Sequence, residues 1–138
     1  MSAAETPLVG LLVGSESDRE AMQPALDELT ARGIPHEFEV RSAHRNPDAV
    51  AEYARTARER GIRVLIAGAG LAAALPGAVA AHTDLPVIGV PLTSRLSAMG
   101  GLDALLSIAQ MPPGVPVACV GLDNARNAGH LAARILAA

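Results

Sequence analysis

Aromatic residues are almost absent from this chain. Half of its 138 residues are hydrophobic, yet there is one tyrosine, one phenylalanine and no tryptophan. The core must therefore be built from Ala, Val, Leu and Ile, whose small side chains suit close packing of helices on a sheet. A surface rich in aliphatic residues also favours burial against partner subunits.

Cysteine is equally scarce. Cys119 is the only one, so no disulfide can form within the chain. It lies in the apolar run 115–120, which predicts a place in the core. The chain is long enough to bury roughly two thirds of its unfolded surface, so a stable fold needs neither a disulfide nor a metal. We expect one domain over residues 1–138.

The charge pattern excludes further classes of protein. The net charge is −3, with no run of basic residues and no basic residues interleaved with aromatics, so a nucleic-acid partner is not expected. No apolar stretch approaches the length of a membrane span, and residues 1–7 lack the pattern of a secretory leader. We expect a cytoplasmic protein without a membrane partner.

Short apolar runs alternate with segments of helical periodicity along the whole chain. Helical spacing follows each run, and Gly33 closes the first helix. The second run alternates acidic and apolar residues, which is typical of a strand near a sheet edge. The pattern predicts an α/β fold with a single doubly wound, flavodoxin-like parallel sheet in the strand order 2-1-3-4-5. The five expected strands are 8–13, 35–41, 63–67, 85–91 and 115–120, and the better defined helices are 47–60 and the segment from about 123 to the end of the chain.

The loop after the second strand holds the strongest candidate for chemistry. Pro47 suits the first turn of a helix, so His44 and Arg45 fall in the strand-to-helix loop where open α/β sheets bind ligands. An imidazole beside a permanent guanidinium charge suits proton transfer on an anionic substrate. A solvated surface loop accounts for the pair equally well.

Two glycine segments follow other strands. In 14–18, a sharp turn, serine hydroxyls and helix amides suit a phosphate, and Asp18 suits a ribose diol. Ordinary helix capping by Ser17 and Asp18 is the alternative. Segment 68–70 lacks the third glycine of a dinucleotide site, so it either brings amides to a carboxylate or forms a tight turn.

The remaining histidines argue against other kinds of site. His36, His82 and His130 are scattered, without the spacing of metal ligands. The sequence also contains no nucleophile motif of the Gly-x-Ser-x-Gly type. We therefore expect neither a metal site nor covalent catalysis.

Taken in order, seven motifs resemble those of the phosphoribosylaminoimidazole carboxylase catalytic-subunit family, and they cover essentially the whole chain. The Gly-Ala-Gly at 68–70 is most similar to the bacterial branch, the N5-carboxyaminoimidazole ribonucleotide mutases. The resemblance implies an isomerase or lyase of purine biosynthesis that moves a carboxylate from the exocyclic nitrogen to C4 of an aminoimidazole ribonucleotide. It implies neither metal nor organic cofactor, and a homo-octamer with sites at subunit interfaces. The motifs are 14–18, 42–47, 67–70, 75–77, 85–91, 101–112 and 127–129.

The resemblance also implies roles for single residues. His44 would be the proton shuttle, and Asp18 would bind the ribose hydroxyls. Gly70 and neighbouring amides would face the migrating carboxylate. The 5′-phosphate would be held by Ser15, Ser17 and Arg45, and the other expected substrate-binding residues are Ser42, Leu71, Ala74 and Leu75.

Three features depart from the family pattern. Leu71 and Ala74 stand where glycine and histidine are usual, Arg19 stands where tryptophan is common, and segment 92–101 is slightly longer. Because these changes touch the expected pocket, two alternatives stay open. One is a carboxylase or decarboxylase of a related ribonucleotide, and the other is a non-catalytic nucleotide-binding homologue.

Overall fold

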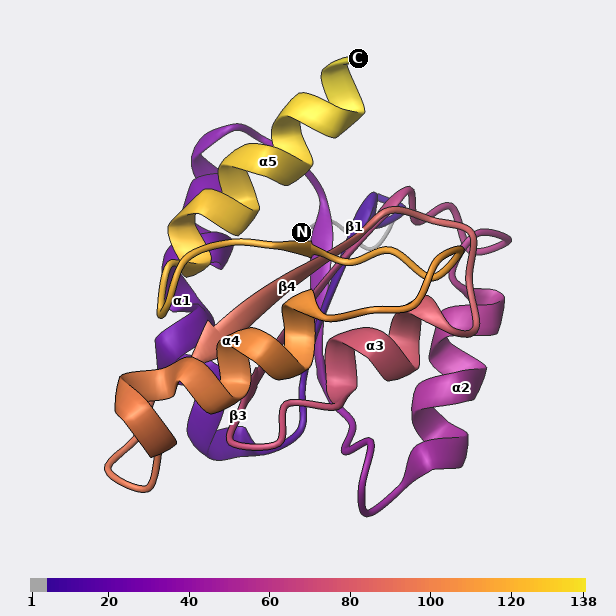
Figure 1. The fold of residues 1–138 in the computed structure, drawn as a ribbon. Coiled ribbons are helices and arrows are strands. Elements are labelled where there is room, and N and C mark those ends of the chain that lie inside the picture. The colour runs from indigo at the N-terminus through magenta and orange to yellow at the C-terminus, as the bar shows by residue number, and fades with distance from the viewer. Residues whose placement is uncertain (1–4) are drawn as a thin grey trace.

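A five-stranded sheet forms the middle layer of the protein, with helices on either side of it (Figure 1), in a computed structural model that describes residues 5–138. Residues 1–4 of the expected domain lie outside the described part. All neighbouring strands pair in parallel, in the order β2-β1-β3-β4-β5. The predicted flavodoxin-like sheet is therefore confirmed, and β2 lies at its edge. The strands are β1 (Val9–Val13), β2 (His36–Val40), β3 (Val64–Gly70), β4 (Val87–Leu92) and β5 (Ala118–Cys119).

Helices cover both faces of this sheet. One face is packed by α1 (Arg19–Ala31) and α5 (Ala125–Ala137). The helices α2, α3 and α4 cover the other face, and α3 and α4 lie in front of the sheet in Figure 1. No helix in the described chain is both long enough and apolar enough to cross a membrane. The remaining elements are α2 (Pro47–Thr56), α3 (Leu75–Ala80), α4 (Leu102–Ala109) and the short 3₁₀ helices η1 (Glu16–Asp18) and η2 (Ala98–Gly101).

The core is aliphatic, as the composition predicts. Every residue of β1 is buried, because its side chains alternate between the two helical layers. Leu11 packs with α1 and α5, whereas Leu12 packs with α2 and α3. Tyr53 is the one fully buried aromatic side chain among the described residues, at 1% exposure.

Some boundaries differ from the predicted ones. Segment 68–70 is not a loop but the end of β3, where it pairs with β4. The second helix ends at Thr56 instead of Arg60, because the chain then tightens into turns with bonds between residues three apart. The fifth strand shrinks to two residues, and Pro116 contributes because it has no amide hydrogen to donate to the sheet.

The prediction that Cys119 lies in the core holds only in part, because Cys119 packs against the buried cluster of Ala73, Ala104 and Ile108 without being fully buried. Its side chain is only half-buried, since β5 is the other edge strand of the sheet. Partial burial raises the pKa of the Cys119 thiol, which disfavours the reactive thiolate. The last helix also begins slightly later than expected, at Ala125, where Asn124 accepts a hydrogen bond from the Asn127 amide.

A polar cluster between β2 and α2 surrounds the buried tyrosine. The Tyr53 hydroxyl donates to Glu37 Oε2 at 2.7 Å, and Arg60 Nη2 donates to both oxygens of Glu37 at 2.6 Å. Burial and the Glu37 carboxylate raise the pKa of Tyr53, so the phenol keeps the proton it donates. On β1, Gly10 leaves room for the ring, because a Cβ there would lie 2.2 Å from the Tyr53 hydroxyl oxygen.

We expect Gly10→Ala to lower the free energy of unfolding by about 1–3 kcal/mol, the usual cost of an overpacked core. The new methyl group would push the Tyr53 hydroxyl away from Glu37. Urea denaturation followed by circular dichroism measures this change. In the control, Gly121→Ala, the added carbon would meet its nearest neighbour only at 3.9 Å, so stability should not fall.

The tyrosine hydroxyl itself provides a second check. Tyr53→Phe removes the oxygen that the new methyl group meets and leaves the ring carbon, which lies 3.1 Å from the Cβ position. Gly10→Ala should therefore cost less in the Tyr53→Phe background than in the wild type. Equal costs in the two backgrounds would contradict this explanation.

Candidate functional site

Three strand-to-helix connections meet at the carboxyl ends of β1, β2 and β3, near the lower edge of Figure 1. Parallel strands place all their carboxyl ends on one edge of the sheet, where open α/β proteins bind ligands. A cleft of about 250 Å³ opens there. Its lining residues are Gly14, Ser15 and Asp18 after β1, Ser42, Ala43, His44 and Arg45 after β2, Ala69 and Gly70 at the end of β3, and Ala72, Ala74 and Leu75 from there to the start of α3.

The connection after β1 brings a hydroxyl and a carboxylate to the cleft. Ser15 Oγ accepts a bond from the Ser17 amide at 3.3 Å and lies 2.9 Å from Ser17 Oγ. Ser15 is thus the residue that caps η1, and Asp18 makes no capping bond with its side chain. Burial raises the pKa of Asp18. A hydroxyl group of a ligand that donates to this carboxylate would favour its charged form.

The connection after β2 is a tight loop with its own hydrogen bonds. Ser42 Oγ accepts from the Arg45 amide at 3.1 Å, and the Ser42 carbonyl accepts from the Asn46 amide at 2.9 Å. Asn46 then caps α2 by accepting from the Ala49 amide at 3.3 Å. These bonds use the backbone and leave the side chains of His44 and Arg45 exposed.

Arg45 carries a positive charge that is available to an anion. None of the ion pairs among residues 5–138 involves its guanidinium group. A planar guanidinium group binds phosphate or carboxylate oxygens through two parallel hydrogen bonds. The cleft therefore combines a proton carrier, His44, with an anion-binding group next to it.

The third connection is built from small and apolar residues. Gly70 still pairs with Leu92 of β4, and a Cβ at Gly70 would lie 2.9 Å from the Leu92 carbonyl oxygen. Leu71 follows with a φ of +54°, a left-handed conformation that is uncommon for a side chain of this size. Its side chain is 42% exposed. Ala74 is exposed, and Leu75 is buried.

The structure brings most of the predicted site residues together. Ser17 and Leu71 are the exceptions, because neither lines the cleft. Ser17 touches it only through its bond to Ser15, and Leu71 is exposed next to the lining residues Gly70 and Ala72. Sequence reasoning did not single out Gly14, Ala43, Ala69 and Ala72, which have no side-chain chemistry. The sequence feature that could have identified these four residues is their position inside or next to the family motifs.

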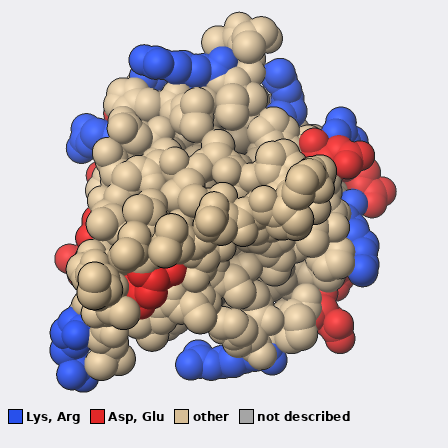
Figure 2. Space-filling view, in the orientation of Figure 1, with Lys and Arg blue, Asp and Glu red and all other residues tan. Residues whose placement is uncertain are grey.

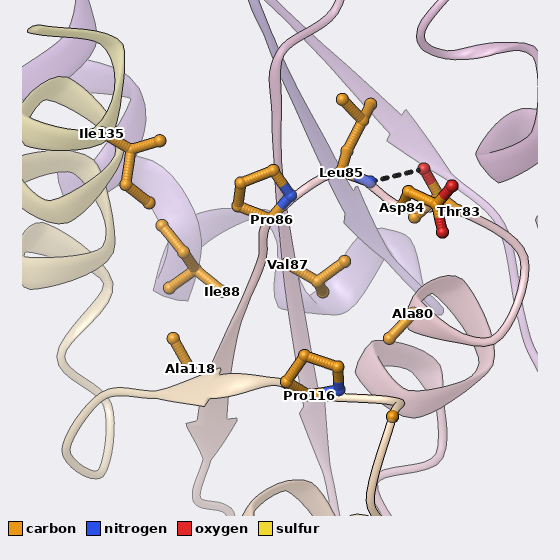
Figure 3. Close-up of a pocket in the computed structure, with 11 residues that line it drawn as sticks. Ala80, Thr83, Asp84, Leu85, Pro86, Val87, Ile88, Pro116, Ala118 and Ile135 are labelled. Carbon is orange, nitrogen blue, oxygen red and sulfur yellow. Dashed lines mark hydrogen bonds between the residues drawn. The ribbon is translucent and has the colours of Figure 1, made fainter. Parts of the chain in front are cut away.

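A larger hollow of about 430 Å³ lies at the amino end of β4, away from the carboxyl ends that form the cleft (Figure 3). Ile88, Ala118 and Ile135 give it an apolar wall. The Thr83 hydroxyl already accepts a bond from the Leu85 amide at 3.1 Å, which Figure 3 draws as a dashed line. Few polar groups are left there to orient a polar ligand, so the smaller cleft is the candidate active site.

Residues 5–138 contain no group of three His, Cys, Asp or Glu side chains that could hold a metal ion. The polar groups of the cleft are a guanidinium group, an imidazole and a hydroxyl, which can bind an anion, and a carboxylate, which can accept hydrogen bonds from hydroxyl groups of a ligand.

Known proteins resemble the chain over nearly its whole length. The family model for AIR carboxylase matches residues 8–138. The N5-carboxyaminoimidazole ribonucleotide mutase of Bacillus subtilis is 60% identical over 96% of this chain and 82% of its own length. The mutase of Aquifex aeolicus is 58% identical over 94% of this chain and 77% of its own length.

A solved structure agrees in fold. The crystal structure of Treponema denticola PurE superposes with a TM-score of 0.82 at 30% sequence identity, and the match covers 95% of this chain and 80% of that one. The sheet order, the cleft and the family match all lead to one assignment. The chain belongs to the AIR carboxylase family.

Proposed function

We propose that this protein is an N5-carboxyaminoimidazole ribonucleotide mutase of de novo purine biosynthesis and that the cleft around His44 is its active site. One observation carries the proposal: His44 and Arg45, from one loop, share a cleft with Ser15 and Asp18. A ribonucleotide needs an anion-binding group, a partner for its ribose hydroxyls and a proton carrier, and the cleft supplies each. The names of the similar mutases support the same reaction.

The cleft residues divide the substrate among them. Arg45 and Ser15 hold the 5′-phosphate, and Ser17 supports Ser15 through its hydroxyl contact. Asp18 accepts hydrogen bonds from the ribose hydroxyls. The carboxylate that migrates lies near the backbone at Gly70. The remaining wall of the substrate site is formed by Ser42, Ala74 and Leu75, with Leu71 next to it.

His44 moves the proton that the reaction needs. When the bond between the carboxylate and the exocyclic nitrogen breaks, its electron pair returns to that nitrogen, which takes a proton from His44. Carbon dioxide stays in the cleft, and C4 of the electron-rich imidazole attacks it to form the new carbon–carbon bond. His44 then removes the C4 proton, which restores its starting state. The proton is returned, so no oxidant or reductant is required.

Small apolar side chains serve the carbon dioxide intermediate. Ala43, Ala69 and Ala72 line the cleft and offer no nucleophile to trap it. Once a second copy closes the cleft, this apolar surface holds the gas next to C4 at a high effective concentration and keeps water away.

We propose further that the protein is a homo-octamer with its active sites at subunit interfaces. A volume of 250 Å³ is below the range of about 300–1,000 Å³ that encloses most small ligands, and His44 is exposed in a single chain. A second copy of the chain would supply the missing part of the wall of this cleft. Figure 2 shows a broad surface over α3 and α4 with hardly any charged side chains except at its rim and near the start of α4. Exposed apolar residues include Met99, Leu102 and Leu106.

The cytoplasm is the compartment that we propose. A chain whose one cysteine cannot form an internal disulfide gains nothing from an oxidising compartment.

Leu71 and Ala74 favour one alternative, a lyase that acts as a carboxylase or decarboxylase on a related ribonucleotide. Leu71 places an apolar side chain with a left-handed backbone beside the cleft, and Ala74 offers no polar contact to a substrate. Such a loop changes the shape and polarity of the cleft where the carboxylate would lie. Turnover of related ribonucleotides, measured in parallel with the mutase substrate, separates the two reactions.

We expect His44→Asn to lower turnover of N5-carboxyaminoimidazole ribonucleotide by about 10²–10⁴-fold, the usual contribution of a general acid or base. Chromatographic detection of the C4-carboxylated product measures the rate. His36→Asn is the matched control, because His36 begins β2, at the end of that strand opposite to the loop of His44. It should leave the rate unchanged.

The outcomes of that assay distinguish the candidate functions. Equal rates in the wild type and His44→Asn would remove His44 from the mechanism. A wild type that converts only a related ribonucleotide would replace the mutase with the lyase alternative. Binding of the nucleotide without any turnover would identify a non-catalytic homologue.

Arg45→Gln should raise KM by about tenfold to a hundredfold, because hydrogen bonds to a charged group contribute about 1.5–3 kcal/mol. The reacting carbon is remote from the phosphate, so kcat should fall by less than KM rises. Steady-state kinetics measures both constants. Arg55→Gln, on the exposed side of α2, removes the same charge outside the cleft and should change neither.

Leu106→Glu should dissociate the octamer and lower activity with it. Leu106 lies on α4 and is 47% exposed in one chain, so a carboxylate there would be buried against a neighbour without a partner charge. Analytical ultracentrifugation should give a wild-type mass eight times the 14.1 kDa of one chain. Arg58→Glu, at an exposed position just after α2, is the control. A wild type that sediments as a fully active monomer would exclude the octamer.

A further inference from the structure

Arg41 stands just before the loop that carries His44 and Arg45, and its side chain reaches the far end of that loop. Its Nη1 donates to the carbonyl oxygen of Ala49, in the first turn of α2, at 2.7 Å. Its Nε and Nη2 lie 2.8 and 2.7 Å from Glu39 Oε1 on β2. One guanidinium group therefore joins the end of β2 to the start of α2.

The backbone at each end of the loop is fixed as well. The Arg41 amide donates to the Val13 carbonyl of β1 at 2.8 Å, which holds the start of the loop against the sheet. Ala49 belongs to a regular helix, which holds the other end. His44 and Arg45 are exposed within one chain, and neither takes part in an ion pair among residues 5–138. Hydrogen bonds from the Arg45 and Asn46 amides to Ser42 shape the loop, so the positions of His44 and Arg45 depend on how its two ends are held.

The location of Arg41 follows from the alternation of β2. Glu37, Glu39 and Arg41 are two residues apart, so they point to the same side of the strand, toward α2. The Arg41 guanidinium carbon lies 5.1 Å from the centre of the Tyr53 ring on that helix. Its side chain is 27% exposed and that of Glu39 is 32% exposed, so water shields this pair only in part. A forked guanidinium group can serve the carboxylate and the carbonyl at once, whereas a lysine would have a single nitrogen.

We propose that Arg41 is a positioning residue that holds His44 and Arg45 in their working places without touching the substrate. The inference rests on the proposed function, because it assigns those two residues to proton transfer and phosphate binding. Without the bonds from Arg41 to Glu39 and Ala49, the loop can shift. A shift of an ångström or so at a catalytic group is enough to lower the rate strongly.

Arg60 provides a matched control within the same cluster. Its Nη2 lies 2.6 Å from both oxygens of Glu37, and its guanidinium carbon lies 5.4 Å from the centre of the Tyr53 ring. It follows α2 and pairs near the amino end of β2, away from the catalytic loop. Arg41→Met and Arg60→Met therefore each remove one ion pair and one cation over the same ring, but only the first loosens the loop.

We expect Arg41→Met to lower kcat/KM by at least about tenfold, whereas Arg60→Met keeps wild-type constants even if its melting temperature falls equally. In the His44→Asn background, Arg41→Met should lower kcat little further, because a residue that acts through His44 has no effect on kcat once His44 is gone. Arg41→Lys, which retains the charge beside Glu39, should recover part of the loss. Equal kinetics in Arg41→Met and Arg60→Met would overturn the proposal. So would an Arg41→Met substitution that lowers kcat as much in the His44→Asn background as in the wild type.

A second measurement does not depend on turnover. The chain has four histidines, so the His44 ring signals can be assigned by comparison with His44→Asn in an NMR spectrum. In the free protein, Arg41→Met should shift these signals and Arg60→Met should not. Titration with inorganic phosphate should then show weaker binding in Arg41→Met alone. A wild type that fails to convert the mutase substrate would refute the proposed function, but unshifted His44 signals in Arg41→Met would refute the role of Arg41.

Discussion

The parallel pairing of β1 with β2 on one side and β3 on the other is the constraint on which the rest of this protein depends. Val13, at the end of β1, pairs with Val40 of β2 on one side and with Gly68 of β3 on the other. The three connections that follow these strands are therefore forced into one region, and their side chains form a single cleft. The same pairing buries β1 on both faces, which requires helices above and below the sheet. Core stability and the location of the site thus have a common origin.

The β2–α2 cluster links that scaffold to the chemistry. Tyr53 fills the space that Gly10 leaves open, and its hydroxyl is satisfied by Glu37. Glu39 and Arg41, the next two positions on the same side of the chain, continue the polar row up to the loop of His44 and Arg45. The buried aromatic ring of Tyr53 thus contacts a row of charged groups that extends from the interior to the loop of His44.

Polar and apolar surfaces have separate places in the molecule. Charged and hydroxyl groups that suit a ribonucleotide line the small cleft, and the surface over α3 and α4 is nearly free of charge (Figure 2). The cleft is too small and too open to enclose a nucleotide, and the uncharged surface has apolar side chains to bury. Association of several copies would bury the apolar side chains and enclose the cleft at once, because a neighbour that covers the apolar surface can also close the cleft.

Apolar runs and helical periodicity are local properties, so the order of strands and helices could be predicted without the structure. The sequence also placed His44 and Arg45 in a loop, because Pro47 marks a helix start. The family resemblance supplied roles for residues in the loops. Tertiary structure decided what depends on distant neighbours: β3 extends to Gly70 because β4 lies beside it, and Cys119 is half-buried because β5 is an edge strand. The contact of Arg41 with Ala49 likewise exists only because α2 folds back on β2, and no local pattern in the sequence encodes that approach.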